Sequence, residues 1–197
     1  THVSRHRTLT EWMDASIVDE LDPFNRNPEL DLYNPDGPVQ APYTEEFVAR
    51  YRAAQEARNR RITAWVKEQL ADLKRAGKEH TERAFVVHGT MADPRWLDPA
   101  IDPNDRRPGW CYLGDPAIVN MSPVGLARFC TLRGWLSQWS IDDAHADAVS
   151  CGPDIDVPTL VVGNSADDAC TPSHTNRIYG AMGAAVKQLV MIIGGRH

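Results

Sequence analysis

Apolar and polar positions follow a helical rhythm in the stretch of chain after Thr44. Thr44 can cap a helix, the acidic residues 45–46 suit its positive start, and apolar residues then recur at helical spacing as far as Leu73. Gly77 can end the helix. The run 52–61 is so polar that we expect this part of the helix, or helix pair, to be solvated, as in a lid or appendage.

The segments around this helix are less regular. Before residue 44, repeated Asp-Pro and Asn-Pro pairs exclude long elements, although a short helix from Leu9 to Val18 fits the pattern. Residues 84–88 form a compact apolar run that predicts a strand, whereas residues 91–120 predict a long loop. Ser122-Pro123 then predicts the start of a helix whose apolar face extends to Trp139.

The last fifty residues have a different pattern. Two continuous apolar runs, 157–162 and 187–193, predict buried strands, and Thr171-Pro172 predicts a helix between them as far as Met182. A strand, a helix and a strand in this order form a right-handed crossover with parallel strands. We therefore expect an α/β fold, with a mainly helical cap or lid over residues 1–150 and a strand–helix–strand core over residues 151–197.

Composition narrows the class of protein. The 197 residues carry a net charge of −6 from well-mixed signs, so nucleic acid is not an expected partner. The sequence has no apolar run long enough for a membrane span. We expect a soluble, cytoplasmic protein, with secretion left open because a signal before Thr1 would not be seen.

The four cysteines are spaced by about twenty residues and make no C-x-x-C pair, which gives little support to a metal site; they are Cys111, Cys130, Cys151 and Cys170. Free thiols are the expectation, with a single disulfide as the alternative in a secreted protein. We expect neither a metal nor an organic cofactor.

Candidate catalytic residues follow the two predicted C-terminal strands. Asp167 follows the first strand and His197 follows the second, with Asp168 as a rival acid. The carboxyl ends of neighbouring parallel strands lie at one edge of a sheet, where α/β proteins place their sites. A carboxylate and an imidazole at that edge have the arrangement that a general base and its orienting acid require.

These residues resemble the α/β-hydrolase family, whose last core strands carry the patterns P-x-L-x-x-x-G-x-x-D-x-x-x-P and G-x-x-H. The matching positions are Pro158, Leu160, Asp167 and Pro172 in the first pattern, and Gly194 and His197 in the second. Gly163 comes one position early and Pro172 lies five rather than four residues past Asp167. The resemblance covers about residues 153–197.

The resemblance implies a hydrolase of carboxylic esters or related acyl compounds that uses a Ser-Asp-His triad. Asp167 and His197 would be the acid and the base. The sequence has no G-x-S-x-G turn, and Ser165 only approaches that pattern, so we expect the serine to lie upstream, in an N-terminal remainder of the same protein. The substrate would be a small acyl compound.

Several alternatives stay open. The chain could be a non-catalytic α/β-hydrolase-like binding module, or Thr1 could be an N-terminal nucleophile.

Trp135 and Trp139 lie on one helical face, where they would either pack in the cap core or line an acyl pocket as substrate-binding residues. His88-Gly89 suits an ordinary strand end better than an oxyanion hole, and His174 is expected to be an exposed helix residue.

Overall fold

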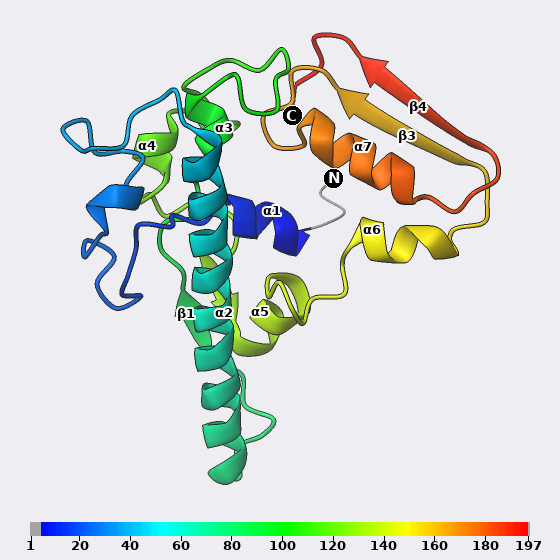
Figure 1. Ribbon diagram of the computed structural model, residues 1–197. Coiled ribbons are helices and arrows are strands. Elements are labelled where there is room, and N and C mark those ends of the chain that lie inside the picture. The colour runs from blue at the N-terminus through cyan, green and yellow to red at the C-terminus, as the bar shows by residue number, and fades with distance from the viewer. Residues whose placement is uncertain (1–4, 197) are drawn as a thin grey trace.

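The computed structural model describes residues 5–196, with side chains from residue 9 onward, and shows a mixed α/β fold (Figure 1). Its elements in chain order are α1 (Arg5–Trp12), η1 (Pro28–Leu30), α2 (Glu45–Arg75), β1 (Ala84–Val86), α3 (Pro94–Leu97), α4 (Pro116–Val119), β2 (Phe129–Thr131), α5 (Leu132–Gln138), α6 (Ala148–Cys151), η2 (Gly152–Asp154), β3 (Thr159–Asn164), α7 (Pro172–Ala181) and β4 (Lys187–Ile192).

The helix predicted after Thr44 is confirmed as the single 31-residue helix α2. The Thr44 side chain accepts a hydrogen bond from the backbone N–H of Phe47, at 3.2 Å. Acidic residues occupy the first turn and the basic residues Lys74 and Arg75 the last, so both ends complement the helix dipole. Figure 1 shows α2 as the long axis of the molecule, with α1 and α5 beside it.

The expectation that residues 52–61 are solvated holds for one face of α2 only. Gln55, Arg58 and Asn59 are fully buried. The Gln55 amide Nε2 donates to the backbone carbonyl oxygens of Glu11 and Met13, both at 2.8 Å, and of Ala92, at 3.1 Å. These polar side chains are buried because irregular backbone packs against them and needs hydrogen-bond donors.

Arg58 holds the same loops together. Its Nη1 donates to the carbonyl oxygens of Asp14, at 3.0 Å, and Gly89, at 2.9 Å, and its Nη2 donates to that of His88, at 2.6 Å. Gly89 has φ +57°, and a Cβ there would lie 2.5 Å from the Ile17 side chain, so only glycine allows this approach. The guanidinium is neutralised by the Glu20 carboxylate, at 2.7 Å.

The segments on either side of α2 confirm some of the predictions and correct others. The predicted strand at residues 84–88 is present as β1, and it pairs antiparallel with β2. The helix expected from Ser122-Pro123 begins only at Leu132, because residues 122–128 form turns in which Gly125 has φ +133°. The expected loop at residues 91–120 is present, interrupted by the short helices α3 and α4. The first helix also differs from expectation, since α1 ends at Trp12.

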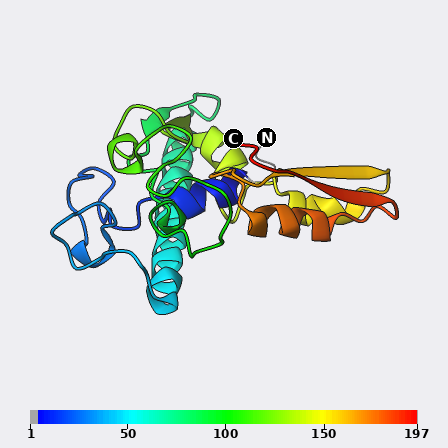
Figure 2. The same cartoon turned by 90° about the horizontal axis from the view of Figure 1, so that it is seen from above.

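The predicted order of the C-terminal elements is confirmed, but the expected burial of the two strands is wrong, because one face of their sheet is open to solvent. Strands β3 and β4 are parallel neighbours, with register from Thr159↔Lys187 to Asn164↔Ile192, and α7 connects them. Figure 2 shows α7 on one side of this two-stranded sheet and no described element on the other. The open face carries exposed apolar side chains, among them Leu160 and Val162, which are 59% and 52% exposed.

Other expectations concern cysteines, metals and membranes. All four cysteines have free thiols; Cys111 and Cys130 are buried, whereas Cys151 is exposed. In the part of the chain with described side chains, residues 9–196, no three His, Cys, Asp or Glu side chains are grouped so that they could hold a metal ion. None of the helices in this described range combines the length and the apolar character that crossing a membrane demands.

We expect Gln55→Leu to lower the free energy of unfolding by roughly 2–3 kcal/mol, since buried carbonyl groups lose a donor. Glu56→Leu changes the neighbouring half-exposed position of the same helix and should cost less than about 0.5 kcal/mol. Urea unfolding with an unchanged m value measures both. Equal losses for the two variants would show that water satisfies these carbonyls.

Candidate functional site

The carboxyl ends of β3 and β4 lie against each other. The backbone N–H of Ser165 donates to the carbonyl of Ile192, at 3.0 Å, and that of Ala166 to the carbonyl of Gly195, at 2.9 Å. The Asn164 amide donates to the carbonyl of Arg196, at 3.1 Å. The chain after β4 therefore runs across the end of β3 as far as Arg196.

Asp167 sits in the tight turn between β3 and α7. Its side chain is buried, and its Oδ1 accepts hydrogen bonds from the backbone N–H groups of Ala169, at 2.8 Å, and Cys170, at 3.0 Å. The Asn104 amide donates to its carbonyl oxygen, at 2.8 Å. The carboxylate thus caps the turn, and the same contacts fix its orientation.

His197 and Thr1 lie outside the described residues. The expected contact between Asp167 and the His197 imidazole therefore stays a prediction, as does the alternative nucleophile Thr1. The choice between Asp167 and Asp168 as the acid stays a prediction. Asp168 is half-buried, and its backbone carbonyl accepts a hydrogen bond from the Trp96 indole N–H, at 2.8 Å. Both acids therefore lie in a segment that neighbouring loops hold in place.

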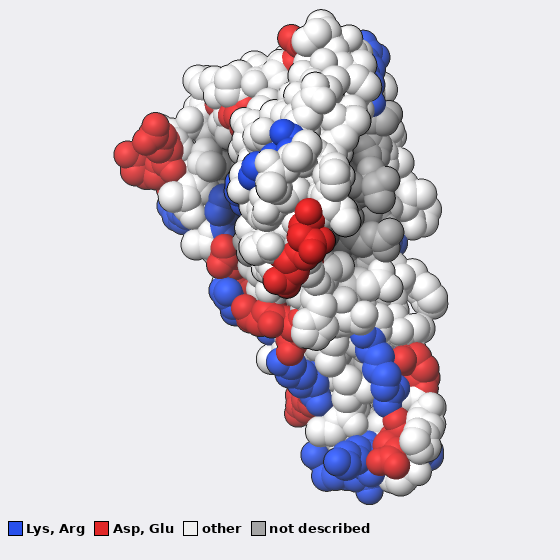
Figure 3. All heavy atoms as spheres, turned by 90° about the vertical axis from the view of Figure 1, so that its right-hand side faces the viewer, with Lys and Arg blue, Asp and Glu red and all other residues white. Residues whose placement is uncertain are grey.

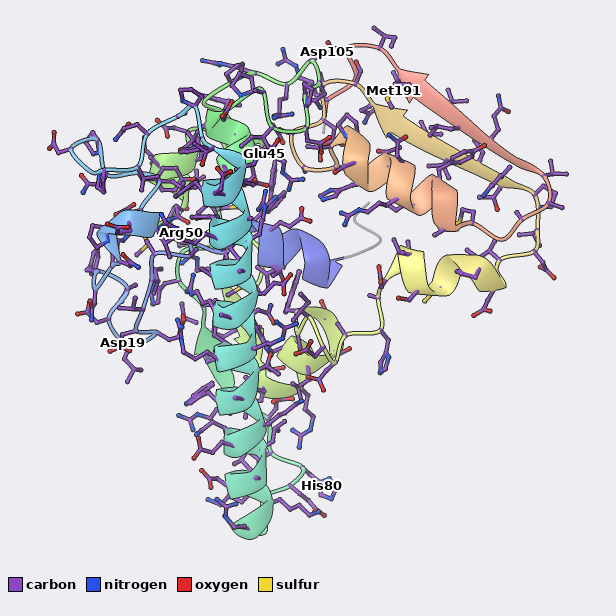
Figure 4. All side chains as sticks on the ribbon, viewed as in Figure 1. Asp19, Glu45, Arg50, His80, Asp105 and Met191 are labelled. Carbon is purple, nitrogen blue, oxygen red and sulfur yellow. The ribbon has the colours of Figure 1, made fainter. Side chains whose placement is uncertain are left out.

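The Ser165 side chain links the end of β3 to the loop that contains Asp105 and to the chain after β4. Its hydroxyl donates to Asp105 Oδ2, at 2.6 Å, and accepts from the backbone N–H of Gly194, at 2.8 Å. Figure 4 shows Asp105 in the loop near the end to which β3 and β4 point. Among residues 9–196, whose side chains the structure describes, no imidazole is a hydrogen-bond partner of this hydroxyl, so its contacts favour a positioning role over that of a nucleophile.

A buried group of charges underlies the start of α7. The Arg95 guanidinium, which is 5% exposed, donates to Asp93 Oδ2 through Nε, at 2.8 Å, and to Glu11 Oε2 through Nη2, at 2.6 Å. Its Nη1 donates to the Thr171 hydroxyl, at 3.0 Å. Asp93 also pairs with Arg52 of α2, at 2.7 Å. We call these residues, together with His174, the Arg95 cluster.

His174 corrects an expectation, because it is buried rather than exposed. Its Nε2 lies 2.6 Å from Glu11 Oε2 and 3.2 Å from Arg95 Nη1. The helical pattern of α7 does not show this burial, because the partner that explains it lies on α1, at the other end of the sequence. Sequence reasoning likewise missed Glu11 and Arg95, which carry no local signal of pairing.

The cluster perturbs two pKa values. Burial alone would raise the pKa of Glu11, but Arg95, His174 and Arg52 hold it well below its usual value of 4.5. Burial alone would lower the pKa of His174, but a hydrogen bond with Cys170 and the bond and charge of Glu11 raise it above its usual 6.5. Both shifts favour the charged forms, a carboxylate at Glu11 and an imidazolium at His174.

The two tryptophans expected to bind substrate lie elsewhere. Trp135 is fully buried in the core between α1, α2 and α5, and its indole N–H donates to the Thr63 hydroxyl, at 2.9 Å. This packing matches the structural alternative. Trp139 is half-buried and lines a surface pocket beside β2 and α5. Figure 1 shows α5 well away from the ends of β3 and β4, so the structure does not bring either ring to Asp167.

We expect the stability lost in His174→Gln to depend on pH. A raised folded-state pKa contributes stability below the unfolded value, near 6.5, and loses it as pH rises through the folded value. The loss should be roughly 2 kcal/mol at pH 6, the order of a hydrogen bond to a charged group, and should shrink toward pH 8. His80→Gln, at an exposed position, should give a small, pH-independent difference in urea unfolding. A His174→Gln loss that grows with pH would contradict the imidazolium assignment.

Comparison of the chain with family models, with curated proteins and with solved structures found no match in any of the three.

Proposed function

We propose that this chain supplies the acid and the base of a Ser-Asp-His hydrolase that acts on carboxylic esters or related acyl compounds. The observation that carries the proposal is the placement of Asp167, a buried carboxylate fixed at the carboxyl end of β3 beside the chain that leads from β4 to His197. Parallel neighbouring strands with an acid after one and an imidazole after the other suit this reaction class.

In this mechanism each residue of the chain has one task. His197 takes the proton of an attacking serine hydroxyl and later returns it to the leaving group. Asp167 holds the imidazole in one tautomer and stabilises its protonated form. The loop that contains Asn104 and Asp105 anchors the chain at the acid itself, Asp167, and two residues before it, at Ser165. The serine is contributed by sequence outside this chain.

The open face of the β3–β4 sheet supports a larger sheet in the complete protein. Strands of parallel sheets are normally covered on both faces, and their side chains are correspondingly apolar. Here the uncovered face presents Leu160, Val162, Val190 and Ile192 to solvent. Figure 3 shows positive and negative side chains interspersed along the lower part of the molecule. We propose that the N-terminal remainder of the same protein packs there.

A non-catalytic binding module is the second candidate. The observation that favours it is the cap formed by Asp167, whose Oδ1 already accepts hydrogen bonds from Ala169 and Cys170. A carboxylate with this local role would keep its position without any reaction to perform. Activity of the complete protein separates the two candidates.

In the complete protein we expect Asp167→Asn to lower turnover of a carboxylic ester by about 10⁴-fold, because the base loses its orienting charge. A fluorophosphonate probe should label the unmodified protein at a serine and label the variant far more slowly. Asp168→Asn is the matched control and should keep most activity. Loss of activity in Asp168→Asn alone would make Asp168 the acid, and no labelling of the unmodified protein would favour the binding module.

The proposal that another part of the protein covers the open face of the β3–β4 sheet has its own test. Val162→Lys in the complete protein should lower the free energy of unfolding by about 3 kcal/mol or more if the face is buried, since an unpaired charge would be desolvated. Asn176→Lys, at an exposed position of α7, should change it by less than about 0.5 kcal/mol. A loss for Val162→Lys as small as that of the control would show that the face remains open to water.

A further inference from the structure

A surface pocket of about 450 Å³ lies beside β2 and α5, away from the ends of β3 and β4. Gly125 and Arg128 line it on one side, and the aromatic residues Phe129 and Trp139 lie on its wall. Phe129 is 72% exposed. The pocket therefore combines one positive charge with accessible apolar surface.

Arg128 is unusual among the buried arginines of this protein. Its side chain is only 7% exposed, and Nη2 donates to the carbonyl oxygen of Asn120, at 2.6 Å. Among the side chains described, those of residues 9–196, none is a hydrogen-bond partner of Nε or Nη1, and both atoms are buried. Burial, followed by the nearby charge of Arg58, lowers the pKa of Arg128. A buried guanidinium without an anion is costly, which indicates that an acceptor is missing.

The acids that could neutralise this region are already engaged. Glu20 pairs with Arg58 and with Arg61, each at 2.7 Å. Burial, followed by Arg128 and Arg58, lowers the pKa of His88 and so favours its neutral form. The buried Asp14 carboxylate accepts a hydrogen bond from the Asn120 amide, at 2.7 Å, and pairs with Arg26, at 3.3 Å. Both nearby acids therefore have partners other than Arg128.

Thr90 adds a second group that lacks a partner. Its hydroxyl Oγ1 is buried, with no hydrogen-bond partner in the described part of the chain. A Cβ on Gly125 would lie 2.8 Å from this oxygen and 3.8 Å from Arg128 Nη2. The glycine, with φ +133°, thus packs closely against the hydroxyl, and a side chain at this position would displace it. Thr90 and Arg128, which belong to two separate segments, therefore both lie close to Gly125, one of the residues that line the pocket.

We propose that this pocket binds an organic carboxylate with an apolar body. The Arg128 guanidinium would donate to the carboxylate in the two-pronged geometry that arginine favours, with Thr90 Oγ1 as a third donor. The apolar body would lie against Phe129 and Trp139. A single guanidinium and an apolar wall suit a monoanion better than a phosphate, which attracts several cations. This binding is independent of the proposed hydrolase activity.

The experiment uses the complete protein, with benzoate and octanoate as probes. Calorimetric titration should show saturable binding of at least one of them, and benzamide and sulfate should bind far more weakly. Arg128→Met should weaken carboxylate binding by roughly tenfold to a hundredfold. Thr90→Val, which removes only the hydroxyl, should weaken it by a smaller factor. Arg133→Met, at a half-exposed arginine of α5, is the matched control and should bind like the unmodified protein.

Thermal unfolding without ligand gives a second readout. Arg128→Met should melt at the same temperature as the unmodified protein or higher, because an uncompensated buried charge is removed, and it should lose the rise that benzoate or octanoate causes. Absence of binding to the unmodified protein, or equal binding of benzoate and benzamide, would overturn the proposal. A strongly destabilised Arg128→Met variant would also overturn it, since the missing acceptor would then belong to the protein itself.

Discussion

Hydrogen bonding of irregular backbone to one buried polar face of α2 is the interaction on which the rest of this structure depends. Gln55 and Arg58 donate to carbonyl groups of Glu11, near the end of α1, and of the irregular segments 13–14 and 88–92. A long helix normally buries apolar residues alone. Here its polar side chains act as fixed donors, so the loops that pack on it adopt one arrangement.

Ion pairs connect this polar face of α2 to the proposed site. Arg52, on α2, pairs with Asp93, and Asp93 also pairs with Arg95. Arg95 in turn binds the Thr171 hydroxyl at the start of α7 and the Glu11 carboxylate, which also contacts His174. The turn that holds Asp167 lies immediately before Thr171. The position of the proposed acid therefore depends on the helical part of the chain as well as on the β3–β4 sheet.

The sequence allowed the C-terminal unit to be predicted because its signals are local. Two apolar runs and a Thr-Pro helix start are enough to predict parallel strands joined by α7. The burial of Arg58 could not be predicted in this way, because its partners are backbone carbonyls that no residue type marks. His174 was missed because Glu11 lies 163 positions earlier. β2 was missed because three residues after a series of turns carry no periodicity.

The central claim is that this framework holds Asp167 against the imidazole of His197. Proton NMR of the complete protein tests it most directly, because an imidazole Nδ1–H donated to a buried carboxylate resonates far downfield of other histidine protons. The account predicts such a resonance in the unmodified protein and in Asp168→Asn, and its loss in Asp167→Asn. A resonance that survives Asp167→Asn, or none in the unmodified protein, would contradict the account.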